Sequence, residues 1–251
     1  MGNTSSKDKP KSFLDLFQDL CKQRSPWEIW ADFVTAAACE ISVSVDAKTS
    51  EKRADEHASI MSRYSAEEQT TLAQMFAETV NALYRNPEQD YLGEMYMQLN
   101  LGNHWKGQFF TPYNICALMS QVQSENAAAE IQKKGWTSVI DPASGAGATL
   151  ISFANSLYKQ GINYQTTTLF CAQDLDRVTA MMCYVQLSLL GCAGYVAVGD
   201  SLRHPVNVGA GALLPVPDAD LDLWYTPMFF ADVWKGRRAA EVLKQWTAPR
   251  K

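Results

Sequence analysis

The chain has 251 residues, of which 47% are hydrophobic and 20% are charged. This composition is typical of a globular protein with one large or two small domains, and it excludes wholesale disorder. Lys and Arg total 22 against 27 Asp and Glu, so the net charge is −5. That balance argues against a protein coated in positive charge for nucleic acid, although it leaves room for a local basic site.

Targeting and metal-binding signals are weak in this sequence. No apolar run reaches the roughly 18 residues that a membrane helix needs, and no signal-peptide pattern is present. The six cysteines form no Cys-x-x-Cys pair, and only three histidines occur. We therefore expect no metal site, reduced cysteines in the core, and a cytoplasmic protein of bacterial, phage or plasmid type.

The first part of the chain has a helical pattern. Residues 1–11 are polar and Lys-rich, which predicts a flexible tail, and residues 12–104 carry apolar side chains at helical spacing. The expected helix boundaries are a cap at Ser12, a first-turn proline at Pro26, a capping box of Ser65 and Glu68, and a stop at Asn86-Pro87. These features predict a helical domain over residues 12–104.

After residue 135, short β-branched runs alternate with helical ones. The predicted strands are 138–141, 168–172, 195–198 and 221–225. The predicted helices between and after them cover about 148–159, a segment capped by Asp176 and ended by Gly191, and a last segment to about Trp246. Such alternation predicts an α/β domain over residues 105–251, with a parallel sheet and helices on its faces.

A glycine loop follows the first predicted strand. Residues 141–147 read Asp-Pro-Ala-Ser-Gly-Ala-Gly, and the next helix begins directly after them. Glycines at this position allow a tight turn and close approach of a ligand to the backbone. The loop lacks the Gly-Lys-Ser/Thr of a nucleoside triphosphate site and the third glycine of a dinucleotide site. The Asp141 carboxylate suits a ligand with an ammonium group, such as S-adenosylmethionine. A purely structural turn is the alternative.

Two further carboxylates follow the next predicted strands. Asp174 is placed to accept the hydroxyls of a ribose, although a helix-capping role is the alternative. Asp200 could accept from the amino group of an adenine. Because ligands of open α/β sheets bind outside the carboxyl ends of the strands, three acidic strand ends predict one ligand site.

The ordered set of motifs resembles the adenine-N6 DNA methyltransferases, especially the modification subunits of type I restriction systems. The resemblance covers about residues 90–230. The segments that carry it are Asp-Tyr-Leu-Gly-Glu-Met-Tyr at 90–96, Gly-Gln-Phe-Phe-Thr-Pro at 107–112, the glycine loop at 141–147, Gln-Asp-Leu-Asp at 173–176, and Gly-Asp-Ser-Leu at 199–202. This resemblance implies a class I, Rossmann-like methyltransferase sheet.

The resemblance also implies roles for matching residues. Thr111 and Pro112 would lie by the methionine carboxylate of S-adenosylmethionine, Asp174 would hold the ribose, and Asp200 the adenine amino group. The full set of implied cofactor-binding residues is Phe110, Thr111, Pro112, Asp141, Ala143, Gly145, Gly147, Asp174, Leu175, Asp200 and Ser201. Relative to the family pattern, Ser144 replaces Cys, Ala146 replaces Ser, and Asp174 replaces Glu.

The catalytic motif departs from the family. The fourth strand should end in Asn/Asp-Pro-Pro-Tyr/Phe, in which an amide oxygen and a carbonyl accept the N–H groups of adenine. The aromatic residue of the motif stacks on the flipped base. Here the segment is Thr226-Pro227-Met228-Phe229. We expect Thr226, Pro227 and Phe229 to be the catalytic residues of a slow or inactive enzyme, and Thr226→Asn to raise methylation.

The C-terminal part raises two further expectations. Only 21 residues follow Phe230, so we expect a truncated sheet without a target-recognition domain, completed by a specificity-type subunit or a second copy. Residues 234–251 carry six basic residues and one acidic residue, a net charge of +5. This segment either contacts DNA phosphates or is a solvated helix end.

The sequence therefore predicts one of two functions, which experiments can distinguish. The first is an adenine-N6 DNA methyltransferase that uses S-adenosylmethionine and is weak or dependent on a partner. The second is a catalytically inactive methyltransferase-like module that binds or modulates a restriction-modification or other DNA-processing complex. An RNA or protein substrate is a third possibility, which the segment 109–112 disfavours.

Overall fold

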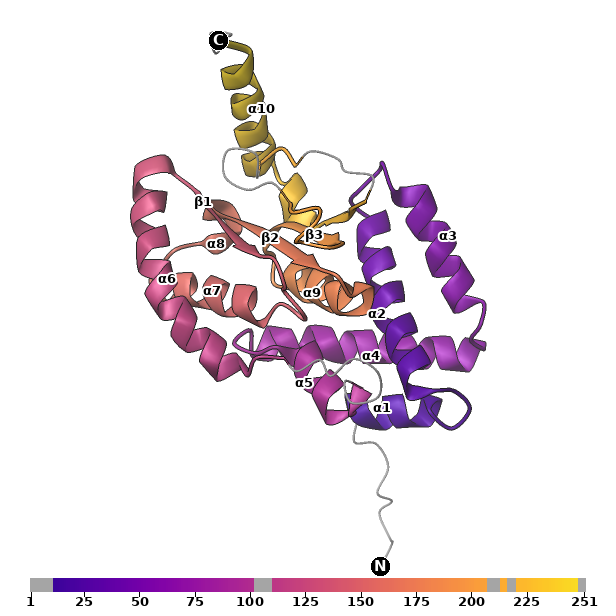
Figure 1. The fold of residues 1–251 in the computed structure, drawn as a ribbon. Helices are drawn as coiled ribbons and strands as arrows, with labels where there is room; N and C mark the ends of the chain where they lie inside the picture. The colour runs from indigo at the N-terminus through magenta and orange to yellow at the C-terminus, as the bar shows by residue number, and fades with distance from the viewer. Residues whose placement is uncertain (1–10, 102–109, 207–212, 216–219, 248–251) are drawn as a thin grey trace, which may run out of the picture.

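The computed structural model describes residues 11–101, 110–206, 213–215 and 220–247 (Figure 1). The described elements before the sheet are helices α1 (Phe13–Leu20), α2 (Pro26–Val43), α3 (Ser50–Met61), α4 (Ala66–Arg85), α5 (Tyr91–Gln98) and α6 (Tyr113–Lys134). The elements that follow are β1 (Thr137–Asp141), α7 (Ala148–Lys159), α8 (Tyr164–Thr167), β2 (Thr168–Asp174), α9 (Arg177–Leu189), β3 (Ala193–Val198), β4 (Asp222–Tyr225), the 3-10 helix η3 (Pro227–Phe230) and α10 (Asp232–Thr247).

Local signals in the sequence set the helix ends. The Ser12 side chain accepts the N–H of Asp15 and forms a capping box, and Ser65 forms the predicted one with Glu68. Pro26 stands at the first turn of α2, and α4 ends just before Pro87. Each of these predicted boundaries is confirmed, because a cap or a proline acts within a few residues of its own position.

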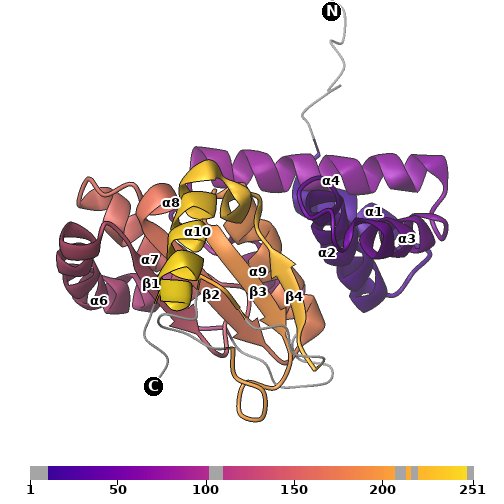
Figure 2. The ribbon, with the colours of Figure 1, turned by 90° about the horizontal axis from the view of Figure 1, so that it is seen from above.

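The sheet has the order β1-β2-β3-β4. β1, β2 and β3 are parallel, and the register aligns Asp141 with Ala172 and Asp174 with Val198. Their carboxyl ends therefore meet at one edge, as predicted. In Figure 2 the strands fan from β1, beside α6, to β4, beside the N-terminal helices.

The fourth strand corrects the prediction of an all-parallel sheet. β4 runs antiparallel to β3, with Asp222 opposite Val198 and Tyr225 opposite Tyr195. In a doubly wound sheet the fourth strand lies beside the first, whereas here it lies at the far edge. The end of β4 consequently points away from the carboxyl ends of the other strands.

A buried arginine accounts for the position of β4. The Arg53 guanidinium, on α3, lies 2.6 Å and 3.2 Å from the two carboxylate oxygens of Asp222 and 3.3 Å from the ring centre of Trp224. The Tyr184 hydroxyl, on α9, donates to the carbonyl of Tyr225 at 3.0 Å. Two helices thus hold β4 against β3.

Each face of the sheet has its own apolar core. On one face, Phe170, Ala172 and Val196 pack with α7, α9 and the N-terminal helices in a continuous cluster that reaches Phe13 and Trp30. The opposite face is smaller and packs against η3 and the start of α10. Its buried members include Leu169, Cys171, Tyr195, Phe229 and Trp234. The N-terminal helices and one face of the sheet therefore share a single core.

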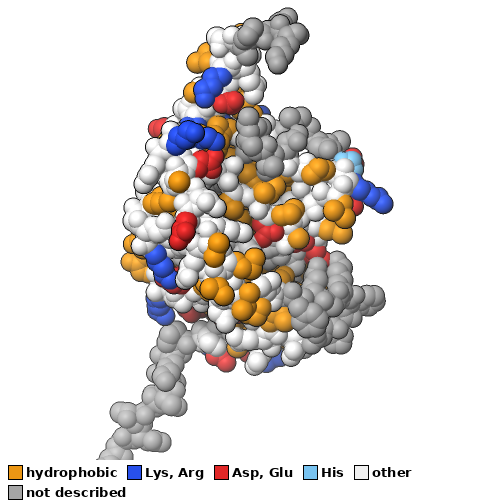
Figure 3. Space-filling model, turned by 60° about the vertical axis from the view of Figure 1, so that its left-hand side comes forward, with side chains coloured by type: hydrophobic (Ala, Val, Ile, Leu, Met, Phe, Trp, Pro, Cys, Tyr) orange, Lys and Arg blue, Asp and Glu red, His pale blue; other side chains and the backbone are white. Residues whose placement is uncertain are grey.

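Helix α6 flanks α7 through small polar residues. The Ser120 hydroxyl oxygen lies 2.7 Å from that of Ser152 of α7, and the Ser124 hydroxyl oxygen lies 2.7 Å from that of Ser156. Its outer side is apolar and exposed at Ile115, Leu118, Met119 and Val122. Figure 3 shows hydrophobic side chains on this side of the molecule, with scattered Lys, Arg, Asp and Glu side chains among them. Within the described ranges, no helix has the length and apolarity that crossing a bilayer requires.

Candidate functional site

The candidate site is built on the glycine loop between β1 and α7. Gly145 and Gly147 have positive φ angles of 52° and 99°, which favour glycine. A Cβ at Gly147 would lie 2.9 Å from the sulfur of Cys183, and one at Gly145 would lie 3.0 Å from the ring of Phe110. Both the backbone turn and the close packing therefore require glycine at these positions.

Asp141 stabilises the start of the loop. Its carboxylate accepts the N–H of Ala143 at 3.0 Å, and the Thr149 hydroxyl of α7 also donates to it. The loop ends at Gly147, which is the residue before the first turn of α7. The free N–H groups of that turn give the loop a partial positive charge.

Asp174 connects the end of β2 to the glycine loop. One carboxylate oxygen accepts the Gly145 N–H at 2.8 Å. The other accepts the Asp176 N–H at 2.8 Å and the Thr179 hydroxyl at 3.1 Å. A carboxylate has about four lone-pair sites, so these three bonds leave room for one further donor. Leu175 follows and is 73% exposed, beside the loop end of β2.

Asp200 lies on the adjoining loop after β3. The Gly199 N–H donates to the carbonyl of Asp174 at 3.0 Å, which ties the two strand ends together. The Asp200 carboxylate accepts the N–H groups of Leu202 at 2.9 Å and Arg203 at 3.3 Å. Ser201 is half-buried beside it. The three acidic strand ends thus lie along one rim, as the sequence predicted.

The segment before α6 reaches the same rim. Phe110 packs over Gly145 and lies 5.2 Å from the ring of Tyr96, and the exposed Thr111 and Pro112 lead into α6. The part of the resemblance at residues 107–109 lies outside the described residues. The structure therefore brings Phe110, the glycine loop, Asp174 and Asp200 together.

The predicted catalytic residues lie at the opposite end of the sheet from the glycine loop and the acidic strand ends. Because β4 is antiparallel, Thr226 lies beside Gly194 at the start of β3. The Thr226 side chain is fully buried; its hydroxyl donates to the carbonyl of Cys192 at 2.7 Å and accepts the Gly194 N–H at 3.0 Å. Within the described ranges, this hydroxyl contacts backbone groups of β3 and of the residue before it.

Pro227 and Phe229 share that location. They belong to η3, and Phe229 is buried. Its ring lies 4.7 Å from Tyr225, and the Arg238 guanidinium lies 4.0 Å above it. A ring that is only 6% exposed has no free face for a flipped base.

The described basic side chains of the C-terminal segment make hydrogen bonds and ion pairs within the chain. Arg237 donates to the carbonyl of Gly135 at 2.9 Å, and Arg238 donates to the carbonyl of Phe229 at 2.8 Å. Lys235 pairs with Asp232 and Lys244 with Glu241. Arg250 and Lys251 lie outside the described residues. These contacts favour a role in folding for the described basic residues over the alternative of phosphate contacts.

Two buried glutamines support the rim: Gln173 lies in one of the matched segments, and sequence reasoning missed Gln186. The Gln173 amide donates to the carbonyl of His204 at 2.9 Å and accepts the Val206 N–H at 3.0 Å, so it orders the loop that holds Asp200. Gln186 contacts the glycine loop from α9. The sequence does carry one signal for Gln186. It is a polar residue on an apolar helix face, next to Val185 and one turn from Met182.

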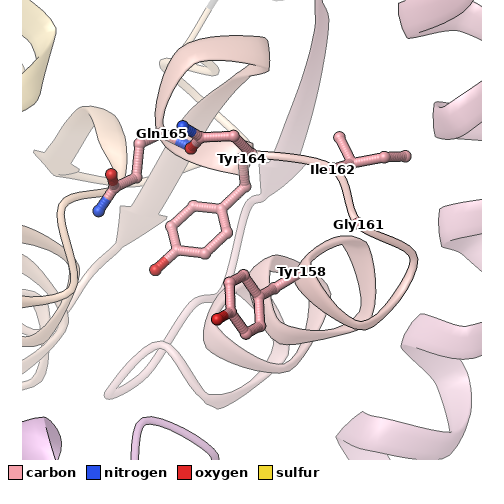
Figure 4. Close-up of a pocket in the computed structure, with 6 residues that line it drawn as sticks. Tyr158, Gly161, Ile162, Tyr164 and Gln165 are labelled. Carbon is pink, nitrogen blue, oxygen red and sulfur yellow. The ribbon is translucent and has the colours of Figure 1, made fainter.

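A separate hollow lies at the other end of the sheet. It measures about 300 Å³ and opens between the end of α7 and the start of β2 (Figure 4). The residues that line it are Tyr158, Gly161, Ile162, Asn163, Tyr164 and Gln165. It contains none of the predicted site residues. Among the described residues, no group of three or more His, Cys, Asp or Glu side chains is arranged to hold a metal.

A glycine loop joined to acidic ends of parallel strands is the arrangement at which open α/β folds commonly bind ligands. A family model described as N-6 DNA Methylase matches residues 87–243, which is more than half of the chain. The chain therefore belongs to the N-6 DNA methylase family, and the predicted resemblance is confirmed. A search of curated proteins and a search of solved structures each found no significant match.

Proposed function

We propose that this chain binds S-adenosylmethionine at the carboxyl ends of β1, β2 and β3 and serves adenine-N6 methylation of DNA as a cofactor-binding unit. The observation that carries the proposal is the hydrogen bond from the Gly145 N–H to Asp174. It joins the glycine loop and the acidic end of β2 into one rim. When bound, S-adenosylmethionine supplies an electrophilic methyl group.

The charges of the rim fit this cofactor. Asp141, Asp174 and Asp200 give the rim three carboxylates, and the guanidinium of Arg203 is 3.5 Å from Asp200. S-adenosylmethionine carries an ammonium and a sulfonium group and no phosphate, so this surface attracts it. The same carboxylates repel the pyrophosphate of a dinucleotide.

Methyl transfer needs more than this rim. The amino group of adenine requires hydrogen-bond acceptors that direct its lone pair to the methyl group. Within the described ranges, the Thr226 hydroxyl cannot act there, because it lies at the other end of the sheet. The acceptors must come from other residues or from a partner chain. The described part of the chain therefore supports a catalytically inactive module over a self-sufficient enzyme.

Calorimetric titration with S-adenosylmethionine tests the cofactor site. Gly145→Ala adds a Cβ that strains the backbone and meets Phe110, so we expect cofactor affinity to fall by about tenfold or more. Gly161→Ala is the matched control, since Gly161 also has a positive φ, of 77°, but has open space around it and lies away from the loop. The control should bind as the wild-type protein does. No binding by the wild type, or equal losses in both variants, would overturn the proposal.

A further inference from the structure

Gln186 connects three parts of the fold through one side chain. It is fully buried on α9. Its amide oxygen accepts the Leu92 N–H at 3.0 Å, and its amide nitrogen donates to Asp90 at 2.8 Å and to the carbonyl of Ala146 at 2.9 Å. An amide side chain has two donors and one acceptor oxygen, so each group of Gln186 is used.

Asp90 fixes the orientation of that amide. Its carboxylate caps α5 by accepting the Gly93 N–H at 2.9 Å and also accepts the Gln186 amide. A Cβ at residue 93 would come within 2.1 Å of the same carboxylate, so the cap requires glycine there. Because the ionised Asp90 carboxylate can only accept, it forces the NH₂ group of Gln186 to face it, which leaves the second N–H for Ala146.

The contact with Ala146 sets one peptide of the glycine loop. The Ala146 carbonyl and the Gly147 N–H belong to the same peptide plane. Gln186 holds the carbonyl, and the Ser144 carbonyl accepts the Gly147 N–H at 2.8 Å. The peptide is thus fixed at both ends. Glycine-rich loops otherwise sample many conformations, and ordering them on binding reduces affinity.

We propose that Gln186, oriented by Asp90, is a positioning residue that preorganises the glycine loop for the cofactor. This inference rests on the proposed function, because it assumes that the loop binds S-adenosylmethionine. Neither residue touches the ligand in this account. Both act through the Ala146–Gly147 peptide.

A swapped pair separates positioning from a merely structural role. Gln186→Glu removes the donors and sets two carboxylates together. Adding Asp90→Asn removes the repulsion between the carboxylates and lets Asn donate to Glu from the position of Oδ1, although the Gly93 N–H then loses its acceptor. The ionised Glu still lacks a donor for the Ala146 carbonyl. We expect the double variant to recover thermal stability relative to Gln186→Glu. Its affinity for S-adenosylmethionine should stay about tenfold or more below that of the wild type.

Hydrogen exchange gives a readout that does not depend on the cofactor. In Gln186→Leu, the Gly147 amide should exchange faster than in the wild type, because its peptide is held at one end only. Gln165→Leu is the control, since that amide donates to the carbonyl of Leu190, outside the loop. It should leave Gly147 exchange unchanged.

The outcomes distinguish the two proposals. Recovery of both stability and affinity in the swapped pair would overturn the positioning role and leave the cofactor site intact. Unchanged Gly147 exchange in Gln186→Leu would also overturn it. If the wild type binds no cofactor while exchange at Gly147 still responds to Gln186→Leu, the proposed function fails and the structural coupling stands.

Discussion

The Thr226 hydroxyl contacts the main chain on two sides. It satisfies the carbonyl of Cys192 and the N–H of Gly194 in a fully buried position. Thr226→Val keeps the shape of the side chain and leaves both backbone groups without this partner. We expect the free energy of unfolding, measured with urea, to fall by about 1–3 kcal/mol.

Thr70→Val is the control for that measurement. Thr70 is exposed on α4 and donates only to the Ala66 carbonyl of its own helix. It should change the free energy of unfolding by less than about 0.5 kcal/mol. Equal effects of the two substitutions would contradict a structural role for the Thr226 hydroxyl.

Asp90 gives the protein a specific dependence of stability on pH. Burial, with a smaller contribution from Glu94, raises the pKa of Asp90 from 3.8 to about 6. The folded state therefore keeps the proton that the unfolded state loses, and stability falls as the pH rises from about 4 to about 6. Above that window, ionised Asp90 lowers the free energy of unfolding by a constant amount of about 3 kcal/mol.

Asp90→Asn removes this titration while its carbonyl oxygen can still accept from Gly93 and Gln186. We expect the stability of the variant relative to the wild type to rise by up to about 3 kcal/mol between about pH 4 and about pH 7. Urea unfolding at the two pH values measures the difference. Parallel pH profiles of the two proteins would show that Asp90 does not titrate in this window.

At the scale of elements, local signals predicted most of the fold. Predicted strand 138–141 corresponds to β1, and the predicted helix 148–159 corresponds to α7. The acidic residues of the parallel strands were found because Asp141 and Asp174 end β1 and β2 and Asp200 follows β3 by two positions. The pairing of β4 with β3 could not be predicted in this way. It depends on Arg53 and Asp222, which are 169 positions apart and show no local pattern.

The position of β4 can be tested through that pair. Although burial acts to raise the pKa of Asp222, Arg53 holds it below its ordinary value. Arg53→Leu removes both this ion pair and the contact with Trp224, and we expect it to lower the free energy of unfolding by about 3 kcal/mol at neutral pH. The loss should be smaller at acidic pH, where the Asp222 carboxyl is protonated.

Lys52→Leu is a matched control, because Lys52 lies 3.6 Å from the same carboxylate but is 68% exposed. Exposed pairs contribute roughly 0–1 kcal/mol, so this variant should unfold almost as the wild type does. If Arg53→Leu and Lys52→Leu lower the free energy of unfolding by the same amount, the buried contact of Arg53 does not hold β4.

At the scale of the whole molecule, the two halves expected from the sequence share one core. Apolar side chains from α1 and α2 continue without interruption into α9 and the sheet. The sequence predicted the helices and the strands but not this continuity, since packing between distant elements has no short-range pattern. The same limit explains why the sequence did not predict that residues 226–229 lie at the far end of the sheet from the glycine loop. A motif match at 226–229 specifies a role only when its strand lies beside the cofactor site.

We propose that cofactor binding and methyl transfer are separated in this chain. The direct measurement is transfer of a labelled methyl group from S-adenosylmethionine to N6 of adenine in unmethylated DNA, with the protein saturated in cofactor. We predict bound cofactor, transfer no faster than in a protein-free control, and no gain from Thr226→Asn. Turnover by the wild type that Thr226→Ala abolishes, with cofactor binding retained, would contradict the account and return Thr226 to the reaction.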